Sequence, residues 1–219
     1  KHLRSLGHFV IGIDASELSG SLGSAFCNEF HRAPPAGAPG YAEFLCERLG
    51  GVDVFLPFID EELIAIACAW ERFPPGLRER IAVSDPDVVL ECVDKCRFQA
   101  ACREAGLPIA PLADSPPAYF KPRLGRGGKG VILADDAPLF DALEHRDGVL
   151  QRAVSGQEYT VDALFSRECE LVATSPRRRL RAAGVSTAGW VAPDAALHEL
   201  AARLGRRWRF RYAINFQVV

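Results

Sequence analysis

Methionine and long apolar runs are both missing from this chain of 219 residues. No stretch approaches the roughly 18 consecutive apolar residues that a membrane-spanning helix requires, so we predict no membrane partner. The apolar run Phe9–Ile13 is short and follows a polar start, so we expect no secretory signal there. Because methionine is absent even at position 1, we expect a processed or truncated chain.

A large net charge is also missing. The 26 Lys and Arg residues and the 28 Asp and Glu residues leave a formal net charge of −2. This balance lacks the basic excess of polyanion-binding domains, so we predict no nucleic acid partner. The 48% of hydrophobic and 25% of charged residues are typical of a packed globular protein. A disordered tail and a collagen-like fibre are therefore excluded.

No two of the seven cysteines form a CxxC pair, so a structural zinc site is not predicted. The chain is long enough to bury a core without disulfides. We therefore expect reduced, mostly buried thiols and a cytoplasmic location. Cys92 and Cys96 lie four residues apart on a predicted helix, where small core residues are the simplest interpretation.

The first part of the chain alternates between predicted strands and helices. Phe9–Ile13 is a continuous apolar run, typical of a strand buried on both faces of a parallel sheet. A helix is predicted over Tyr41–Leu49, a strand over Val52–Phe58, and then a helix that Asp60 caps. This alternation predicts an α/β, Rossmann-like domain over residues 1–84.

The pattern changes after residue 84. Pro86 at a first helical position begins one helix, and Asp94 caps a second helix that Gly106 ends. The strands that we predict afterwards cover 118–122, 131–133, 149–154, 158–165, 170–175 and 212–219, with helices over 138–144 and 195–204. The first two of these strands flank a glycine-rich segment, which we therefore predict to be a hairpin loop.

The glycine-rich segment Gly125–Gly130 carries the strongest chemical signal. Its four glycines expose backbone amides beside the cations Arg126 and Lys129, as in loops that cover nucleotide phosphates. Lys121 lies on the strand before it, and Glu158 opens a later strand. No Ser or Thr follows Lys129, so the segment is not a Walker loop. A plain glycine turn remains the alternative.

Several motifs resemble those of ATP-grasp proteins and occur in the same order. The resemblance is closest to the ATP-binding synthetase domains of the carbamoyl-phosphate synthase large chain and their stand-alone relatives. The matching motifs are Asp94-Lys95 before Phe98, Ala105-Gly106-Leu107-Pro108, Phe120-Lys121-Pro122, the Gly125–Gly130 loop, Gln151, Gly156-Gln157-Glu158-Tyr159 and Asn215-Phe216-Gln217.

The resemblance implies a Rossmann-like pre-ATP-grasp domain followed by an ATP-grasp fold, incomplete at both ends. The implied parts are the pre-ATP-grasp domain over 1–84, a helical part of the A subdomain over 85–117, a lid subdomain over 118–156, and the start of the C-terminal subdomain over 157–219.

The resemblance also implies roles for the matched residues. Arg179 and Lys121 would be catalytic, with Arg179 directed at the γ-phosphate or the acyl phosphate. Gln217 would lie near the metal and the phosphates, and Glu158 would accept hydrogen bonds from the ribose. The implied nucleotide-binding residues are Lys95, Lys121, Gly125, Arg126, Gly127, Gly128, Lys129, Gly130, Gln151, Arg152, Ala153, Val154 and Glu158, the backbone of 151–154 contacting the adenine.

The residues alone leave simpler interpretations open. Lys95 is also compatible with a surface cation on a helix, Glu158 with a charge at a strand edge, and Gln217 with an exposed polar side chain. Arg177–Arg179 suits a solvated turn, and Arg207–Tyr212 suits a strand with one basic face. The carboxylate-containing metal motif of the family is expected beyond Val219; without it, we expect ATP binding without turnover.

The resemblance implies an ATP-dependent carboxylate–amine or carboxylate–ammonia ligase that works through an acyl phosphate. Its cofactors would be ATP and Mg²⁺, its substrates a small-molecule carboxylate and an amine or ammonia, and a homodimer is possible. One alternative is a nucleotide-binding regulatory or assembly subunit without turnover. Another is an NAD-dependent enzyme with Asp14 after its first strand, which requires a glycine motif upstream and leaves the motifs after residue 84 unexplained.

Overall fold

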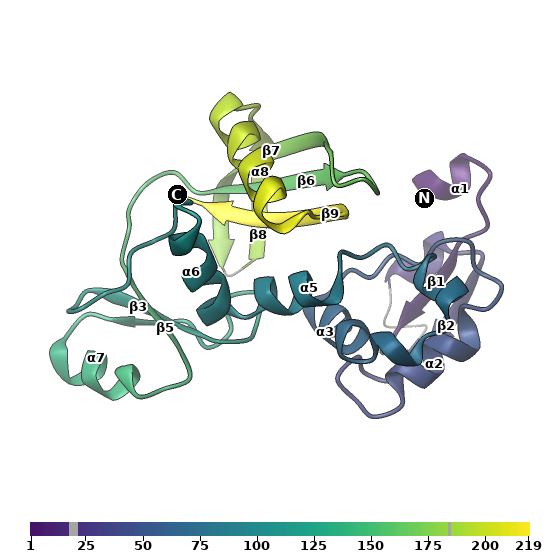
Figure 1. Cartoon of the computed structure of the whole chain (residues 1–219), viewed down its shortest axis with the longest axis horizontal. Helices are drawn as coiled ribbons and strands as arrows, with labels where there is room; N and C mark the ends of the chain where they lie inside the picture. The colour runs from purple at the N-terminus through teal and green to yellow at the C-terminus, as the bar shows by residue number, and fades with distance from the viewer. Residues whose placement is uncertain (18–21, 184) are drawn as a thin grey trace. The chain divides into compact units, whose positions relative to one another are not determined.

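The computed structural model describes residues 1–17, 22–183 and 185–219 (Figure 1). The chain divides into two compact units, Lys1–Ala82 and Val83–Val219. Each unit is considered by itself below. Within the described ranges, no helix is both long enough and apolar enough to cross a membrane.

The first unit contains a small parallel sheet. Strand β1 (Ile11–Asp14) pairs in parallel with β2 (Glu29–Arg32). Phe55 and Ile81 form a further isolated parallel bridge. The helical segments of this unit are α1 (His2–Ser5), η2 (Leu22–Phe26), α2 (Tyr41–Arg48), α3 (Asp60–Cys68), η3 (Trp70–Arg72) and α4 (Pro75–Arg78). The α/β class of this part of the chain is therefore as predicted.

Two local predictions in the first unit are wrong. The predicted strand over Val52–Phe58 is only the bridge at Phe55. A strand inside a parallel sheet is buried on both faces, whereas Val54 and Phe58 are 51% and 83% exposed. Asp60 is the first residue of α3 rather than its cap, which is Ile59. Its carboxylate still lies in the first helical turn, where the helix dipole favours negative charge.

The second unit begins with two short helices, α5 (Pro86–Val93) and α6 (Lys95–Glu104). Asp94 lies between them and caps α6, because its Oδ1 accepts hydrogen bonds from the amides of Cys96 at 3.0 Å and Arg97 at 3.1 Å. The predicted cap and the predicted first residue Pro86 are both confirmed. The cap fixes where α6 begins and so fixes the position of Lys95.

A three-stranded antiparallel sheet follows, in the order β4-β3-β5. Its strands are β3 (Ala118–Pro122), β4 (Ile132–Ala134) and β5 (Gly148–Arg152), and helix α7 (Ala137–Glu144) packs on it. Phe120, Phe140 and Leu143 are buried between the sheet and α7. The glycine-rich segment joins β3 to β4, which confirms the predicted hairpin.

The second sheet of this unit has four antiparallel strands in the order β8-β7-β6-β9. They are β6 (Tyr159–Phe165), β7 (Leu171–Ala183), β8 (Val185–Val191) and β9 (Tyr212–Val218). The turn considered for Arg177–Arg179 is wrong, because these arginines lie inside β7, which pairs with β6 and β8 on its two sides. Strand β7 is longer than predicted, and β8 was not predicted.

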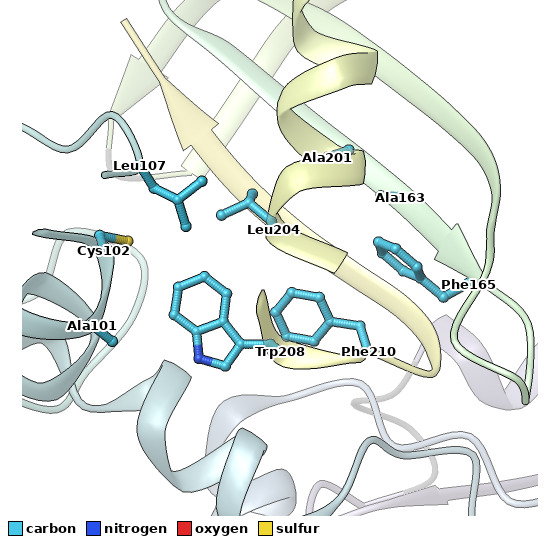
Figure 2. Packing of buried hydrophobic residues seen from close by; sticks show 9 residues of the cluster. All are labelled: Ala101, Cys102, Leu107, Ala163, Phe165, Ala201, Leu204, Trp208 and Phe210. Atoms are coloured by element: carbon cyan, nitrogen blue, oxygen red, sulfur yellow. The ribbon is translucent and has the colours of Figure 1, made fainter. Parts of the chain in front are cut away.

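Helix α8 (Ala195–Trp208) covers one face of the four-stranded sheet (Figure 1). Figure 2 shows Trp208 and Phe210 side by side beneath Leu204, among buried residues from α6, α8 and β6. The Trp208 ring stacks on Phe98 with 5.1 Å between centroids, and its Nε1 donates to Glu91. This packing explains why α8 runs beyond its predicted end.

The segment Arg207–Tyr212 is therefore not a strand with one basic face. It contains the end of α8, the left-handed residue Arg209 with φ 51°, and the buried ring of Phe210. The aromatic residues of this segment pack in the hydrophobic core, and this packing explains why aromatic residues alternate with arginines in its sequence.

The opposite face of the four-stranded sheet is polar. Ala163 and Phe165 face the apolar cluster with α8, so the alternation of β6 directs Thr160 and Asp162 to the other face. Thr160 pairs with Arg177 on β7 and with Gln217 on β9. This polar face carries the side chains from which the candidate site is built.

Candidate functional site

The start of helix α6 is bonded to the strand and loop that precede the glycines. The Nε of Arg123 donates to Oδ2 of Asp94 at 2.8 Å, and the amide of Lys95 donates to the carbonyl oxygen of Arg123 at 3.0 Å. The Nζ of Lys95 donates to the carbonyl oxygen of Gly125 at 2.7 Å. Lys95 is thus a positioned cation at the root of the loop rather than a freely solvated one.

Asp94 is ionised over a wide pH range. Burial raises its pKa, but the hydrogen bonds from Arg123 and from the amides of Arg97 and Cys96 outweigh burial, so the pKa is lowered overall. The carboxylate therefore keeps its charge, caps α6 and pairs with Arg123 throughout the neutral pH range.

Lys121 is a half-buried cation on β3. Burial is the main cause that lowers its pKa, and the charge of Lys95 lowers it further, whereas Glu158 opposes the shift. Two ammonium groups within electrostatic reach of each other disfavour their charged forms until an anion lies between them. The pair is therefore compatible with a phosphate-bearing ligand, the role that the resemblance implies for both lysines.

The loop Gly125–Gly130 has the backbone that its composition suggests. Its four glycines all have positive φ angles, from 63° at Gly127 to 132° at Gly125, a region that residues with a side chain rarely adopt. The whole segment is exposed, including the side chains of Arg126 and Lys129. The loop therefore presents backbone and cations to solvent beside Lys95.

The predicted adenine-contacting segment begins with a buried side chain. Gln151 is 7% exposed, and its Nε2 donates to Oε1 of Gln99 at 2.6 Å. The amides of Arg152 and Ala153 donate to the carbonyl oxygens of Pro111 and Pro117. Val154 is 48% exposed at the end of this segment. The side chain of Gln151 is thus engaged with Gln99, and the exposed part of the predicted segment is Arg152–Val154.

Three of the predicted residues meet on the polar face of the four-stranded sheet. The side chain of Arg179 is only 6% exposed; its Nη1 forms an ion pair with Oε2 of Glu158 at 3.1 Å and donates to Oε1 of Gln217 at 3.0 Å. The backbone amide of Arg179 also donates to the carbonyl oxygen of Glu158 at 2.9 Å. The structure therefore brings Arg179, Glu158 and Gln217 into one hydrogen-bonded group.

The donors present do not by themselves fit a divalent cation. Mg²⁺ takes oxygen ligands, usually including one or two carboxylates, whereas the oxygen of Gln217 already accepts from the cationic Arg179. Among the residues that the structure describes, no three His, Cys, Asp or Glu side chains gather in a way that could hold a metal ion. We therefore assign no metal ligand and derive no step through a metal.

The sequence reasoning missed a second polar group on the same face. Arg177 donates from Nε to Oδ2 of Asp162 at 2.7 Å and from Nη2 to Oδ1 at 3.1 Å, and Asn215 donates to the same Oδ1 at 2.7 Å. Alternation along β6 could have placed Asp162 on the face of Glu158. The pairing with Arg177 depends on the register of β7, which the sequence does not reveal.

No family model matches the chain, and no curated protein matches it in sequence. Solved structures do match. The biotin carboxylase domain dimer of the Hydrogenobacter thermophilus 2-oxoglutarate carboxylase, in complex with MgADP, ADP and bicarbonate, is 15% identical with a TM-score of 0.70, over 98% of this chain and 56% of that chain.

Two further matches have related descriptions. An N5-carboxyaminoimidazole ribonucleotide synthetase in complex with ADP is 13% identical with a TM-score of 0.74, over 98% of this chain and 60% of that chain. The L-amino acid ligase of Bacillus licheniformis is 15% identical with a TM-score of 0.69, over 97% of this chain and 57% of that chain. This chain thus spans less than two thirds of each neighbour.

These neighbours are ATP-grasp proteins, so the fold that the sequence motifs implied is confirmed. At identities of 13–15%, the likeness defines the fold and leaves the reaction to be argued from the residues of this chain.

Proposed function

We propose that this chain binds ATP as part of an ATP-dependent ligase that joins a small carboxylate to an amine or ammonia. The observation that carries the proposal is the position of Lys95, whose Nζ donates to the carbonyl oxygen of Gly125 at the start of the glycine-rich loop, with Lys121 on the strand before that loop. Two cations beside a glycine-rich loop are suited to an anionic ligand, and the polyphosphate of a nucleotide supplies about four negative charges.

The fold supports the choice of a nucleotide. Two neighbours were determined with ADP, and the first also holds MgADP. We propose that ATP binds as its Mg²⁺ complex, the form in which Mg²⁺ would supply counter-charge to the phosphates. No residue of this chain is assigned to the metal.

The residues of this chain would divide the work as follows. Lys95, Lys121 and the amides of the Gly125–Gly130 loop would neutralise the phosphates. Glu158 would accept hydrogen bonds from the ribose hydroxyls, and the exposed backbone at Val154 would meet the adenine. Arg179, held by Glu158 and Gln217, would stabilise charge on the phosphoryl group during its transfer from ATP.

The proposed reaction has two steps. A carboxylate oxygen of the substrate attacks the γ-phosphorus of ATP, and the bond to the β–γ bridging oxygen breaks, which gives an acyl phosphate and ADP. An amine or ammonia then attacks the acyl carbon, inorganic phosphate leaves, and the nitrogen loses a proton. Closure of the glycine loop would exclude water from the acyl phosphate between the steps.

A second candidate is a nucleotide-binding regulatory or assembly subunit without turnover. The hydrogen bond from Arg179 to the oxygen of Gln217 favours this alternative, because it occupies the predicted metal-binding atom. Both candidates bind ATP, and they differ in whether ATP is consumed.

Titration calorimetry with ATP and ADP, each with and without Mg²⁺, tests the shared part of the proposal, with NAD⁺ as the control. We expect ATP to bind more tightly with Mg²⁺ present. In thermal melts, ATP at a concentration a hundred times its Kd should add about 2.7 kcal/mol to the free energy of unfolding. Stabilisation by NAD⁺ but not by ATP would overturn the proposal. Phosphate release with a panel of carboxylates and amines then separates ligase from binding subunit.

The proposal also covers the oligomeric state and the cellular location of this chain. The first neighbour is described as a domain dimer, and we propose that this chain forms a homodimer in the cytoplasm. Light scattering coupled to gel filtration measures the mass in solution, and a monomer at all concentrations would contradict the dimer.

A further inference from the structure

The polar face of the four-stranded sheet holds a second group, the Asp162 cluster, which we define as Asp162, Arg177 and Asn215. Each residue comes from a different strand, β6, β7 and β9, and cross-strand pairing brings them together. None of the three has a role in the nucleotide site proposed above.

The cluster holds the guanidinium of Arg177 in one orientation. Asp162 accepts from Nε and Nη2 of Arg177, at 2.7 and 3.1 Å, and Asn215 fixes the carboxylate with a third hydrogen bond at 2.7 Å. A guanidinium has five N–H donors, so two bonds leave donors to spare. The side chains of Arg177 and Asp162 are 42% and 46% exposed. Both charges are therefore fixed in place and within reach of a ligand.

The cluster lies close to the proposed reacting centre. Arg177 and Arg179 are two residues apart on β7, which corresponds to about 7 Å along a strand. Asp162 is four residues from Glu158 on β6, or roughly 13 Å by the same rise. A small molecule bound to Arg177 would thus lie about 7 Å along β7 from a phosphoryl group held at Arg179.

The proposed nucleotide site and the Asp162 cluster differ in charge. Lys95 on α6 and Lys121 on β3 suit a polyanion, whereas Arg177 and Asp162 together have no net charge. An anion alone would meet both an attractive guanidinium and a repulsive carboxylate. A zwitterion matches both signs, with its carboxylate on the spare donors of Arg177 and its ammonium on Asp162.

We infer that the Asp162 cluster is a binding site for a free amino acid, a zwitterion with carboxylate and ammonium on one carbon. The inference rests on the proposed function, because it names the substrate class of the same site. Arg177 and Asp162 contact the amino acid, and Asn215 is a positioning residue that acts through Asp162.

The test is saturation-transfer NMR on the full 219-residue chain with each of the twenty common L-amino acids in turn. For every amino acid that binds, the matching des-amino carboxylate and the matching decarboxylated amine are measured as well. We expect at least one amino acid to bind, and both of its analogues to bind at least tenfold more weakly.

Arg177→Gln should weaken the binding of that amino acid at least tenfold. The matched control is Arg178→Gln, which changes the next residue of β7 on the opposite face, where Arg178 lies over the Trp190 ring. It should leave the affinity within twofold. Asn215→Ala should weaken binding less than Arg177→Gln, and thermal melts establish that each variant is folded.

Calorimetry with ADP on the same samples separates this inference from the proposed function. If ADP binds but no amino acid does, or if Arg177→Gln binds the amino acid as wild type does, the inference is overturned and the proposed function stands. An equal loss in Arg178→Gln also overturns it. If an amino acid binds through Arg177 but ADP does not bind, the proposed function fails instead.

Discussion

Replacement of Lys121 by methionine should weaken ATP binding without unfolding the protein. A full unit charge about 4 Å from a phosphate is worth about 4 kcal/mol at an effective dielectric constant of about 20. The loss is partly offset because the free protein no longer brings two ammonium groups together. We therefore expect a cost of about 2–4 kcal/mol, which raises the Kd roughly 30-fold to several hundredfold.

The same variant should keep its melting temperature or raise it. Burial and Lys95 lower the pKa of Lys121, which means that the fold disfavours the charged ammonium, and methionine removes that charge while keeping an apolar stem. Calorimetry with ATP gives the Kd, and Lys129→Met is the comparison, because Lys129 is exposed on the loop and should cost less. An unchanged Kd in a folded Lys121→Met protein would refute the phosphate-binding role of Lys121.

Three further outcomes are expected. A bound anion should raise the lowered pKa of Lys121 back toward the ordinary lysine value of 10.5. ATP binding should therefore take up protons at alkaline pH below 10.5, and the affinity for ATP should fall as the pH rises through that window. Binding heats that do not depend on the ionisation enthalpy of the buffer would contradict this. Asp94→Ala should cost about 1–3 kcal/mol by removing a helix cap and a partly exposed ion pair, and Asp94→Asn less, since Asn also caps helices. Because the pKa of Asp94 lies below its ordinary 3.8, its contribution is full above that value and is lost as pH falls through the lowered pKa, which thermal melts would measure. Gly148→Ala should destabilise the protein by about 1–3 kcal/mol or more, because the new Cβ would clash with the carbonyl oxygen of Lys121. The control is Gly37→Ala, whose Cβ would meet nothing within 4 Å. Equal melting temperatures for the two variants would show that the strands around Gly148 adapt.

Features set by neighbouring residues were predictable from the sequence. The cap at Asp94, the helix start at Pro86 and the hairpin around the glycine loop follow from local chemistry, and the structure has all three. The ATP-grasp fold followed from the order of short motifs, and solved structures that are only 13–15% identical to this chain confirm that fold.

Features set by distant partners were not predictable. Val52–Phe58 has a strand-like composition, but only Phe55 pairs with another segment, in an isolated bridge. In Arg207–Tyr212, aromatic residues alternate with arginines because Trp208 and Phe210 pack in the core. The contacts of Arg177 with Asp162, and of Arg179 with Gln217, require the register of three strands. A one-residue shift would send each of these side chains to the other face.

The bonds between the start of α6 and the root of the glycine loop have a consequence for the entropy of loop closure. Asp94 and Lys95 hold Arg123 and Gly125 through side-chain and backbone bonds before any ligand arrives. Fixing the backbone of one residue costs about 1–2 kcal/mol. The residues up to Gly125 have already met that cost on folding, so the proposed closure over a nucleotide would order only the five residues from Arg126 to Gly130. The loop would then pivot from a fixed point, and more of the free energy of nucleotide contact would remain as affinity.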